Sequence, residues 1–194
     1  MLKSGKAALL VCCKLSVICF GNTVWIHAKA RFAQVLIERA WSETLLTGKQ
    51  VTPWPWADFW PVARIIAKQS GKVLFVLSNA SGASLAFGPG HVNGSVLPAT
   101  AGTSIVAGHR DTHFEFLRNI KKGDVLYVQR PDGLSRNYQV SGIQVVDIRY
   151  AKLNVEPGQA VLKLVTCYPF DAVLPGGAKR LVVQLTSERD LLKG

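Results

Sequence analysis

Cysteine is nearly absent from most of this chain. Cys12, Cys13 and Cys19 lie close together near the N-terminus, and Cys167 is the single cysteine in the rest of the 194 residues. One thiol cannot form a disulfide within residues 28–194, and no Cys-x-x-Cys pair is present to hold structural zinc or to form a thioredoxin-like redox centre. A small buried thiol is the common structural situation for a free cysteine. An isolated cysteine is also a candidate reactive thiol.

Acidic residues are scarce as well. The chain has 12 Asp and Glu against 23 Lys and Arg, which gives a net charge of +11. This balance favours anionic partners. The basic residues are scattered and follow no zinc-finger, RNP or P-loop spacing, so nucleic acid is not predicted as a partner. An anionic cell envelope is also compatible with this positive charge.

One apolar segment near the N-terminus is long enough to span a bilayer. It runs from Ala7 to His27, and Lys3 and Lys6 precede it. About 20 apolar residues are needed for a transmembrane helix. The small residues at Ala28–Ala30 also resemble a signal-peptide cleavage pattern. We predict a retained membrane anchor in preference to a cleaved one.

The remaining chain divides into two parts. Residues 28–60 form a connecting segment, in which Ala28 to Gly48 has helical spacing of apolar residues and Val51 to Pro61 is rich in proline and tryptophan. Residues 61–194 have the short, β-rich segments of one further domain. The predicted organisation is therefore an N-terminal anchor (1–27), a connecting helix and linker (28–60) and a β domain (61–194).

Short strands dominate the β domain. The segment from Val62 onward contains two apolar runs around Ser70 and Gly71, which indicates a hairpin. Further runs have the sequences TSIVAG, DVLYVQR, NYQVSGIQVVDIR, AVLKLVT and RLVVQLTS. One helical piece, His113 to Ile120, lies among them. Seven or eight short strands with a single internal helix predict a closed or nearly closed β-barrel, in which no strand edge is exposed.

Three chemically competent residues lie at predicted strand ends. Cys167 ends the strand that begins near Val161, His109 follows an apolar strand and a glycine, and Arg180 begins the last strand. Strand ends gather at the rims of a barrel. A nucleophilic thiol needs a base or imidazolium partner and a donor for the developing oxyanion. These residues could supply all three functions.

Other polar residues near these positions are weaker candidates. His109 and His113 are four residues apart, and with Cys167 they could hold zinc if both histidines lay on one helix. The strand and glycine before His109 argue against such a helix, so no metal and no other cofactor is predicted. His91, in a Gly-Pro loop, and Asp111 could contact a substrate or hold a loop.

The order of these residues resembles that of the sortases, a family of membrane-anchored cysteine transpeptidases. The sequence LVTC, Leu164 to Cys167, is similar to the later part of the sortase pattern T-L-x-T-C, while Lys163 departs from its first threonine. Several other stretches are similar to the sortase branch found in Gram-negative, largely marine proteobacteria. These stretches are AWSETLL, KQVTPWPWADFWPVAR, SLAFGPGHV, AGHRDTHFEFL and LVTCYPFDAVLPGG.

This resemblance implies a mainly β fold, an eight-stranded sortase barrel with short helices. It implies that Cys167 is the nucleophile, His109 the general acid and base, and Arg180 the residue that stabilises the oxyanion or the substrate. The reaction implied is cleavage of an LPxTG-like C-terminal sorting signal after threonine and transfer of the protein to an amine acceptor. Thr166 is expected to line the substrate pocket, with His91, His113 and Asp111 as further substrate contacts.

The partners and the location follow from the same resemblance. A substrate protein with a C-terminal sorting signal, an amine acceptor and the membrane are the expected partners. The barrel is expected in the periplasm, held by a single span in the bacterial inner membrane. Two alternatives remain open: a cysteine peptidase, in which water resolves the acyl-enzyme, and a non-catalytic envelope-anchored barrel that binds protein or glycan.

Overall fold

The computed structural model describes residues 25, 28–155, 157–174 and 176–187. The predicted anchor, Ala7 to His27, lies outside the described residues except for Trp25. Within the described ranges, no helix is both long and apolar enough to cross a membrane. The chain divides between Leu36 and Ile37 into two compact units. The β-barrel belongs to the second unit.

The predicted connecting helix is present at residues 28–47. It ends at Gly48, which has a φ of +67° and donates its amide to the Thr44 carbonyl at 2.9 Å. A positive φ is easily adopted by glycine and is a common helix stop. In the second unit, Ile37, Ala40 and Trp41 form the buried stripe of the helix. Their spacing is that of one helical face.

The proline- and tryptophan-rich linker is packed for part of its length. The ring of Trp54 lies 5.4 Å from that of Phe59 and 5.2 Å from that of Phe87, both at steep angles. This cluster also contains Ile37 and Leu77. The edge-to-face arrangement is the one that aromatic pairs favour. The linker is therefore packed through a small hydrophobic cluster that it shares with Ile37 of the connecting helix and with Leu77 and Phe87.

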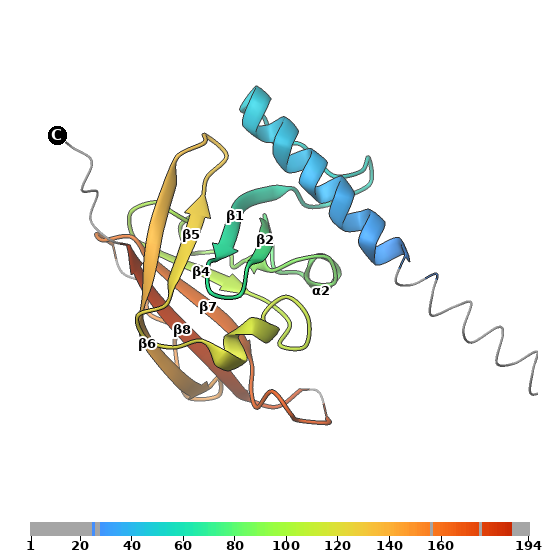
Figure 1. Ribbon diagram of the computed structural model, residues 1–194. Helices are drawn as coiled ribbons and strands as arrows, with labels where there is room; N and C mark the ends of the chain where they lie inside the picture. Colours follow the sequence, from blue (N-terminus) through green and yellow to red (C-terminus); the bar gives the residue numbers. More distant parts are fainter. Residues whose placement is uncertain (1–24, 26–27, 156, 175, 188–194) are drawn as a thin grey trace, which may run out of the picture. The chain divides into compact units, whose positions relative to one another are not determined.

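Eight strands form a closed barrel, as predicted (Figure 1). The strands are β1 (Pro61–Ala67), β2 (Lys72–Leu77), β3 (Gly90–His91), β4 (Thr103–Ala107), β5 (Val125–Gln129), β6 (Ser135–Asp147), β7 (Val161–Cys167) and β8 (Lys179–Ser187). Their order around the barrel is β1-β2-β3-β4-β7-β8-β6-β5. Two short helices interrupt them, α2 (Gly82–Leu85) and the 3₁₀ helix η1 (Glu115–Asn119). The mainly β fold with few helices is confirmed.

The first hairpin forms where the sequence predicts it. β1 and β2 are antiparallel and end on the pair Ala67 and Lys72. Gly71 lies in the turn with a φ of +65°. A residue with a Cβ atom is disfavoured at this angle, so the glycine permits the tight reversal.

Strand β7 lies between β4, which is parallel to it, and β8, which is antiparallel. Its residues alternate between buried and half-buried along the whole strand. Leu162, Leu164 and Thr166 are buried, and the two leucines belong to the barrel core. Because successive side chains of a strand point to opposite faces, Cys167 lies on the other face from these three.

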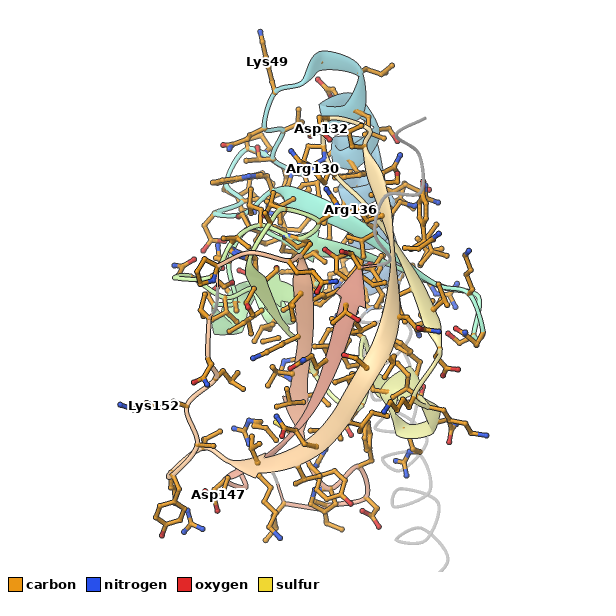
Figure 2. The ribbon with its side chains drawn as sticks, turned by 90° about the vertical axis from the view of Figure 1, so that its left-hand side faces the viewer. Lys49, Arg130, Asp132, Arg136, Asp147 and Lys152 are labelled. Atoms are coloured by element: carbon orange, nitrogen blue, oxygen red, sulfur yellow. The ribbon has the colours of Figure 1, made fainter. Side chains whose placement is uncertain are left out.

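Strand β6 connects the two ends of the barrel. It is 13 residues long, pairs with both β5 and β8, and has an irregularity between Val140 and Gly142. Figure 2 shows Arg130 and Asp132, in the β5–β6 turn, at the opposite end of this curved strand from Asp147. Asp147 pairs with Lys179 at the start of β8. The start of β8 and the end of β7 therefore mark one end of the barrel.

Candidate active site

Three neighbouring strands bring the predicted catalytic residues to this end of the barrel. Cys167 and Arg180 are direct partners in the β7–β8 ladder. The β4–β7 ladder pairs Ala107 with Val165. It continues past β4, because the Gly108 amide donates to the Val165 carbonyl at 3.1 Å. His109 therefore leaves β4 beside Cys167.

The thiol and the imidazole line the same pocket, which has a volume of about 300 Å³. Cys167 is half-buried and His109 is exposed. The lining residues come from two segments, one that follows β4 and one that follows β7. They are His109, Arg110, Asp111, Cys167, Tyr168, Pro169, Ala172, Leu174, Gly176 and Gly177. In the described part of the chain, no hydrogen bond joins the thiol to the imidazole.

A close contact fixes the path of the chain before His109. A Cβ atom on Gly108 would lie 2.8 Å from the ring of Phe114. Phe114 is fully buried in the barrel core, and its amide donates to the His109 carbonyl at 3.0 Å. Glycine is therefore required for the chain to pass this ring, and the amide of Phe114 holds the His109 carbonyl.

Arg180 lies at the rim of the same site. Its Nη1 donates to the backbone carbonyls of Gly177 and Lys179. Gly177 lines the pocket, whereas Arg180 itself is not among the lining residues. Among the described residues, the hydrogen bonds of this guanidinium all come from Nη1, so Nη2 and Nε are the atoms that can donate to a substrate oxygen.

Arg110 lines the pocket and was not singled out from the sequence. Its Nη1 and Nη2 donate to the carbonyls of Pro169 and Ala172, each at 2.5 Å. Its Nε lies 3.2 Å from a carboxylate oxygen of Asp111. The one sequence signal was its position directly after His109 in a loop. The contacts depend on a segment 59 and 62 residues away in the chain.

The weaker candidates differ in whether they line the pocket. Thr166 is buried, and its hydroxyl donates to the Gly108 carbonyl at 2.7 Å. Asp111 lines the pocket, and its carboxylate accepts a hydrogen bond from Arg110. His91 is buried, with Nε2 within 3.0 Å of the Val96 carbonyl and the Ser95 hydroxyl. Thr166 and His91 are not among the pocket-lining residues, and substrate contacts for all three remain predictions.

His113 lies near the pocket without lining it. Burial lowers the pKa of His113 below its ordinary value of 6.5, and the charges of His109 and Lys72 lower it further. A hydrogen bond with the Ala86 backbone acts in the opposite direction. Burial disfavours the charged imidazolium, so His113 is held in the neutral form over a wider pH range than a free histidine.

A metal centre is not formed by the residues considered from the sequence. Residues 110–114 form turns, so His109 and His113 do not share a regular helix. Among the described residues, no group of three His, Cys, Asp or Glu side chains is placed to hold a metal ion. The groups that the structure brings to the site are the thiol of Cys167, the imidazole of His109 and the guanidinium groups of Arg110 and Arg180.

A thiol and an imidazole that share a pocket beside fixed positive charge define a class, the cysteine enzymes of acyl transfer. Comparison with known proteins agrees with this class. A family model described as "Sortase domain" matches residues 66–188. A comparison with curated proteins finds no match.

Solved structures similar to this chain are sortases. Sortase A from Corynebacterium diphtheriae is 28% identical, with a TM-score of 0.61 over 69% of this chain and 63% of its own. Sortase C-1 from Actinomyces oris is 31% identical, with a TM-score of 0.59 over 68% of this chain and 76% of its own. A pilus-related sortase C of Group B Streptococcus is 27% identical, with a TM-score of 0.58 over 66% of this chain and 67% of its own.

The chain belongs to the sortase family. The family model covers most of the barrel, from within β1 to just past the end of β8. The chain spans somewhat less than two thirds of the length of the Corynebacterium sortase. The prediction of the family is confirmed, while the Gram-negative marine branch stays a prediction.

Proposed function

We propose that this protein is a transpeptidase that joins a protein bearing a C-terminal sorting signal to an amine. One observation carries this proposal: Cys167 and His109 line one pocket, and Arg180 is the cross-strand partner of Cys167. The family membership supports the same chemistry. Of the two alternatives, a non-catalytic binding barrel gives no reason for this convergence of reactive groups.

The reaction has two balanced steps. In the first, the Cys167 sulfur bonds to the carbonyl carbon of the scissile peptide, and the C–N bond breaks as His109 gives a proton to the leaving amine. In the second, the acceptor amine attacks the thioester carbonyl, His109 takes a proton from it, and the thiolate leaves. Both tetrahedral intermediates carry an oxyanion.

Arg180 is proposed to stabilise that oxyanion or the substrate backbone. Its guanidinium already donates to backbone carbonyls at the pocket rim. A substrate carbonyl or oxyanion offers the same kind of acceptor, and the bond strengthens as negative charge develops. Differential binding of this kind accelerates the chemical step.

The nature of the sorting signal and the location are further parts of the proposal. An LPxTG-like signal, cleaved after threonine, is supported by the resemblance in sequence. An inner-membrane anchor at Ala7–His27, with the barrel in the periplasm, is supported by the length and apolar character of that segment. Membrane attachment would raise the effective concentration of a membrane-held substrate.

Product analysis tests the proposal against hydrolysis by the same thiol. The full chain in mild detergent is mixed with LPxTG-like peptides, with and without an added small amine. A transpeptidase converts the peptide to the amine adduct in proportion to the amine concentration. Products that contain only the free acid at every amine concentration would instead identify a cysteine peptidase.

A further inference from the structure

The pocket is built from two segments that leave neighbouring strands. One comprises residues 109–114 after β4, and the other comprises the described residues 168–174 and 176–178 before β8. The ladder between β4 and β7 ends at the hydrogen bonds of Gly108. Figure 1 shows the described parts of the β7–β8 loop (orange to red) extending beyond the end of the barrel. Past the ladder, the backbone hydrogen bonds of the described loop residues run to Ile148, to Lys179 and within the loop, and none of them reaches residues 109–114.

Arg110 is the side chain that joins the two segments by hydrogen bonds. Its guanidinium donates to the carbonyls of Pro169 and Ala172, two and five residues after Cys167. Within the described residues, no other hydrogen bond joins segment 109–114 to segment 168–178. We propose that Arg110 is a positioning residue. Its two hydrogen bonds to the β7–β8 loop fix the pocket that Cys167 and His109 line.

The burial of Arg110 fits a fixed bridge better than a surface charge. Its side chain is 11% exposed, whereas that of its partner Asp111 is 69% exposed. Ordering and desolvating a long charged side chain is costly, and hydrogen bonds to charged donors offset that cost. A guanidinium can donate to two carbonyls in a fixed geometry, which an ammonium on a flexible stem cannot do.

The consequence for catalysis is geometric. The thiol is the last residue of β7, and the loop that Arg110 holds starts at the next residue. If the loop is released, Tyr168 and Pro169 no longer keep the pocket wall in place beside His109. A misplacement of about 1 Å can lower a rate by about 10²-fold. Arg110 thus acts through Cys167 and His109 and needs no contact with the substrate.

The experiment compares Arg110→Ala and Arg110→Lys with the parent, using the full chain in mild detergent. Arg110→Lys loses the paired N–H donors of the guanidinium but keeps the positive charge and the aliphatic stem. Because it keeps the charge and the stem, it is the variant expected to fold most reliably. Arg130→Ala is the matched control, because Arg130 also pairs with a nearby aspartate, Asp132, at the opposite end of β6 (Figure 2). Three readouts are taken: thermal stability, kcat and KM with peptide and amine, and the alkylation rate of Cys167.

Alkylation by iodoacetamide is followed on the peptide that contains Cys167, since Cys12, Cys13 and Cys19 can also react. We expect Arg110→Ala to lower kcat about 10²-fold, with a much smaller change in KM. The kcat of Arg110→Lys should stay at least about tenfold below that of the parent, because an ammonium group cannot donate to both carbonyls in the geometry of a guanidinium. In both variants the pH dependence of alkylation should shift towards that of His109→Ala. Arg130→Ala should match the parent.

Two results would overturn this inference. The first is an Arg110→Lys variant with the kcat and alkylation profile of the parent, which would make the role purely electrostatic. The second is a loss in either variant that disappears at temperatures well below its unfolding midpoint, which would make the role one of stability alone.

The inference rests on the proposed function only for its turnover readout. If no peptide acylates the parent, but alkylation at Cys167 shifts in both Arg110 variants, the proposed function fails and the positioning role stands. If peptides acylate the parent and both variants at equal rates, the positioning role fails and the proposed function stands.

Discussion

The two faces of strand β7 differ in what they contribute. The inner face carries Leu162 and Leu164, which are fully buried in the barrel core. The outer face carries Lys163, Val165 and Cys167, which are half-buried. Because a strand alternates its side chains, stability and chemistry are assigned to alternate residues of one element. The strand can therefore hold the proposed nucleophile, Cys167, at its end while leaving it accessible.

The largest effect that we expect is a loss of activity when His109, beside the outer face of β7, is replaced. His109→Ala should lower the rate of acyl transfer by about 10² to 10⁴-fold, the usual contribution of a general acid and base. Its unfolding temperature should match that of the parent, because His109 is exposed. Turnover and thermal melts measured on the same samples test both halves. Added imidazole should recover part of the activity, and a kcat within twofold of the parent would remove His109 from the mechanism.

A substitution on the inner face of β7 should lower stability and leave activity unchanged. Leu164→Ala should lower the free energy of unfolding by about 2–5 kcal/mol, since it removes a buried side chain and leaves a cavity. Turnover well below the unfolding temperature should be that of the parent. Denaturant titration and steady-state kinetics make the test. Val165→Ala, one residue along on the half-buried face, should destabilise less than Leu164→Ala, and the reverse order would contradict the assignment of the two faces.

A substitution at Gly108 should affect both stability and activity. Gly108→Ala places a Cβ atom 2.8 Å from the ring of Phe114. We expect a loss of about 1–3 kcal/mol in unfolding free energy, from overpacking against a buried ring. Acyl transfer should fall as well, because the neighbouring His109 is displaced. Gly142→Ala is the matched control, since its Cβ atom would contact nothing within 4 Å. Equal effects of the two substitutions would refute the role of the Phe114 contact.

The smallest effect concerns pH. The pKa of His113 lies below 6.5 in the folded protein, chiefly through burial. Between that lowered value and 6.5, the unfolded state binds more protons, so stability falls as the pH decreases through this window. His113→Gln should therefore show a smaller loss of thermal stability between about pH 7 and about pH 5 than the parent. An unchanged slope would show that other groups cause the acid sensitivity.

Local sequence signals predicted most strands of the barrel. The hairpin at Gly71 and the strands around Cys167 were visible because turn residues and β-branched runs are local features. The two-residue strand β3 and the four-residue helix α2 were missed. Elements this short contain no periodicity, and their structure depends on neighbours such as β2 and β4.

The site was predictable only in part. Strand ends placed His109, Cys167 and Arg180 at a rim, whereas the resemblance supplied their roles. The structure buries Thr166, which was expected to line the substrate pocket, on the face of β7 opposite Cys167. The bridge made by Arg110 could not be predicted, because its two acceptors are backbone carbonyls of a distant loop. Backbone carbonyls have no signature in a sequence.

The central claim is that the chemistry resides on Cys167 at the end of the outer face of β7. The most direct test is the intact mass of the full chain after mixing with LPxTG-like peptides, beside its Cys167→Ala counterpart. The account predicts a mass increase equal to the peptide fragment up to threonine in the parent and none in Cys167→Ala. Cleavage of the peptide at an undiminished rate by Cys167→Ala would contradict it.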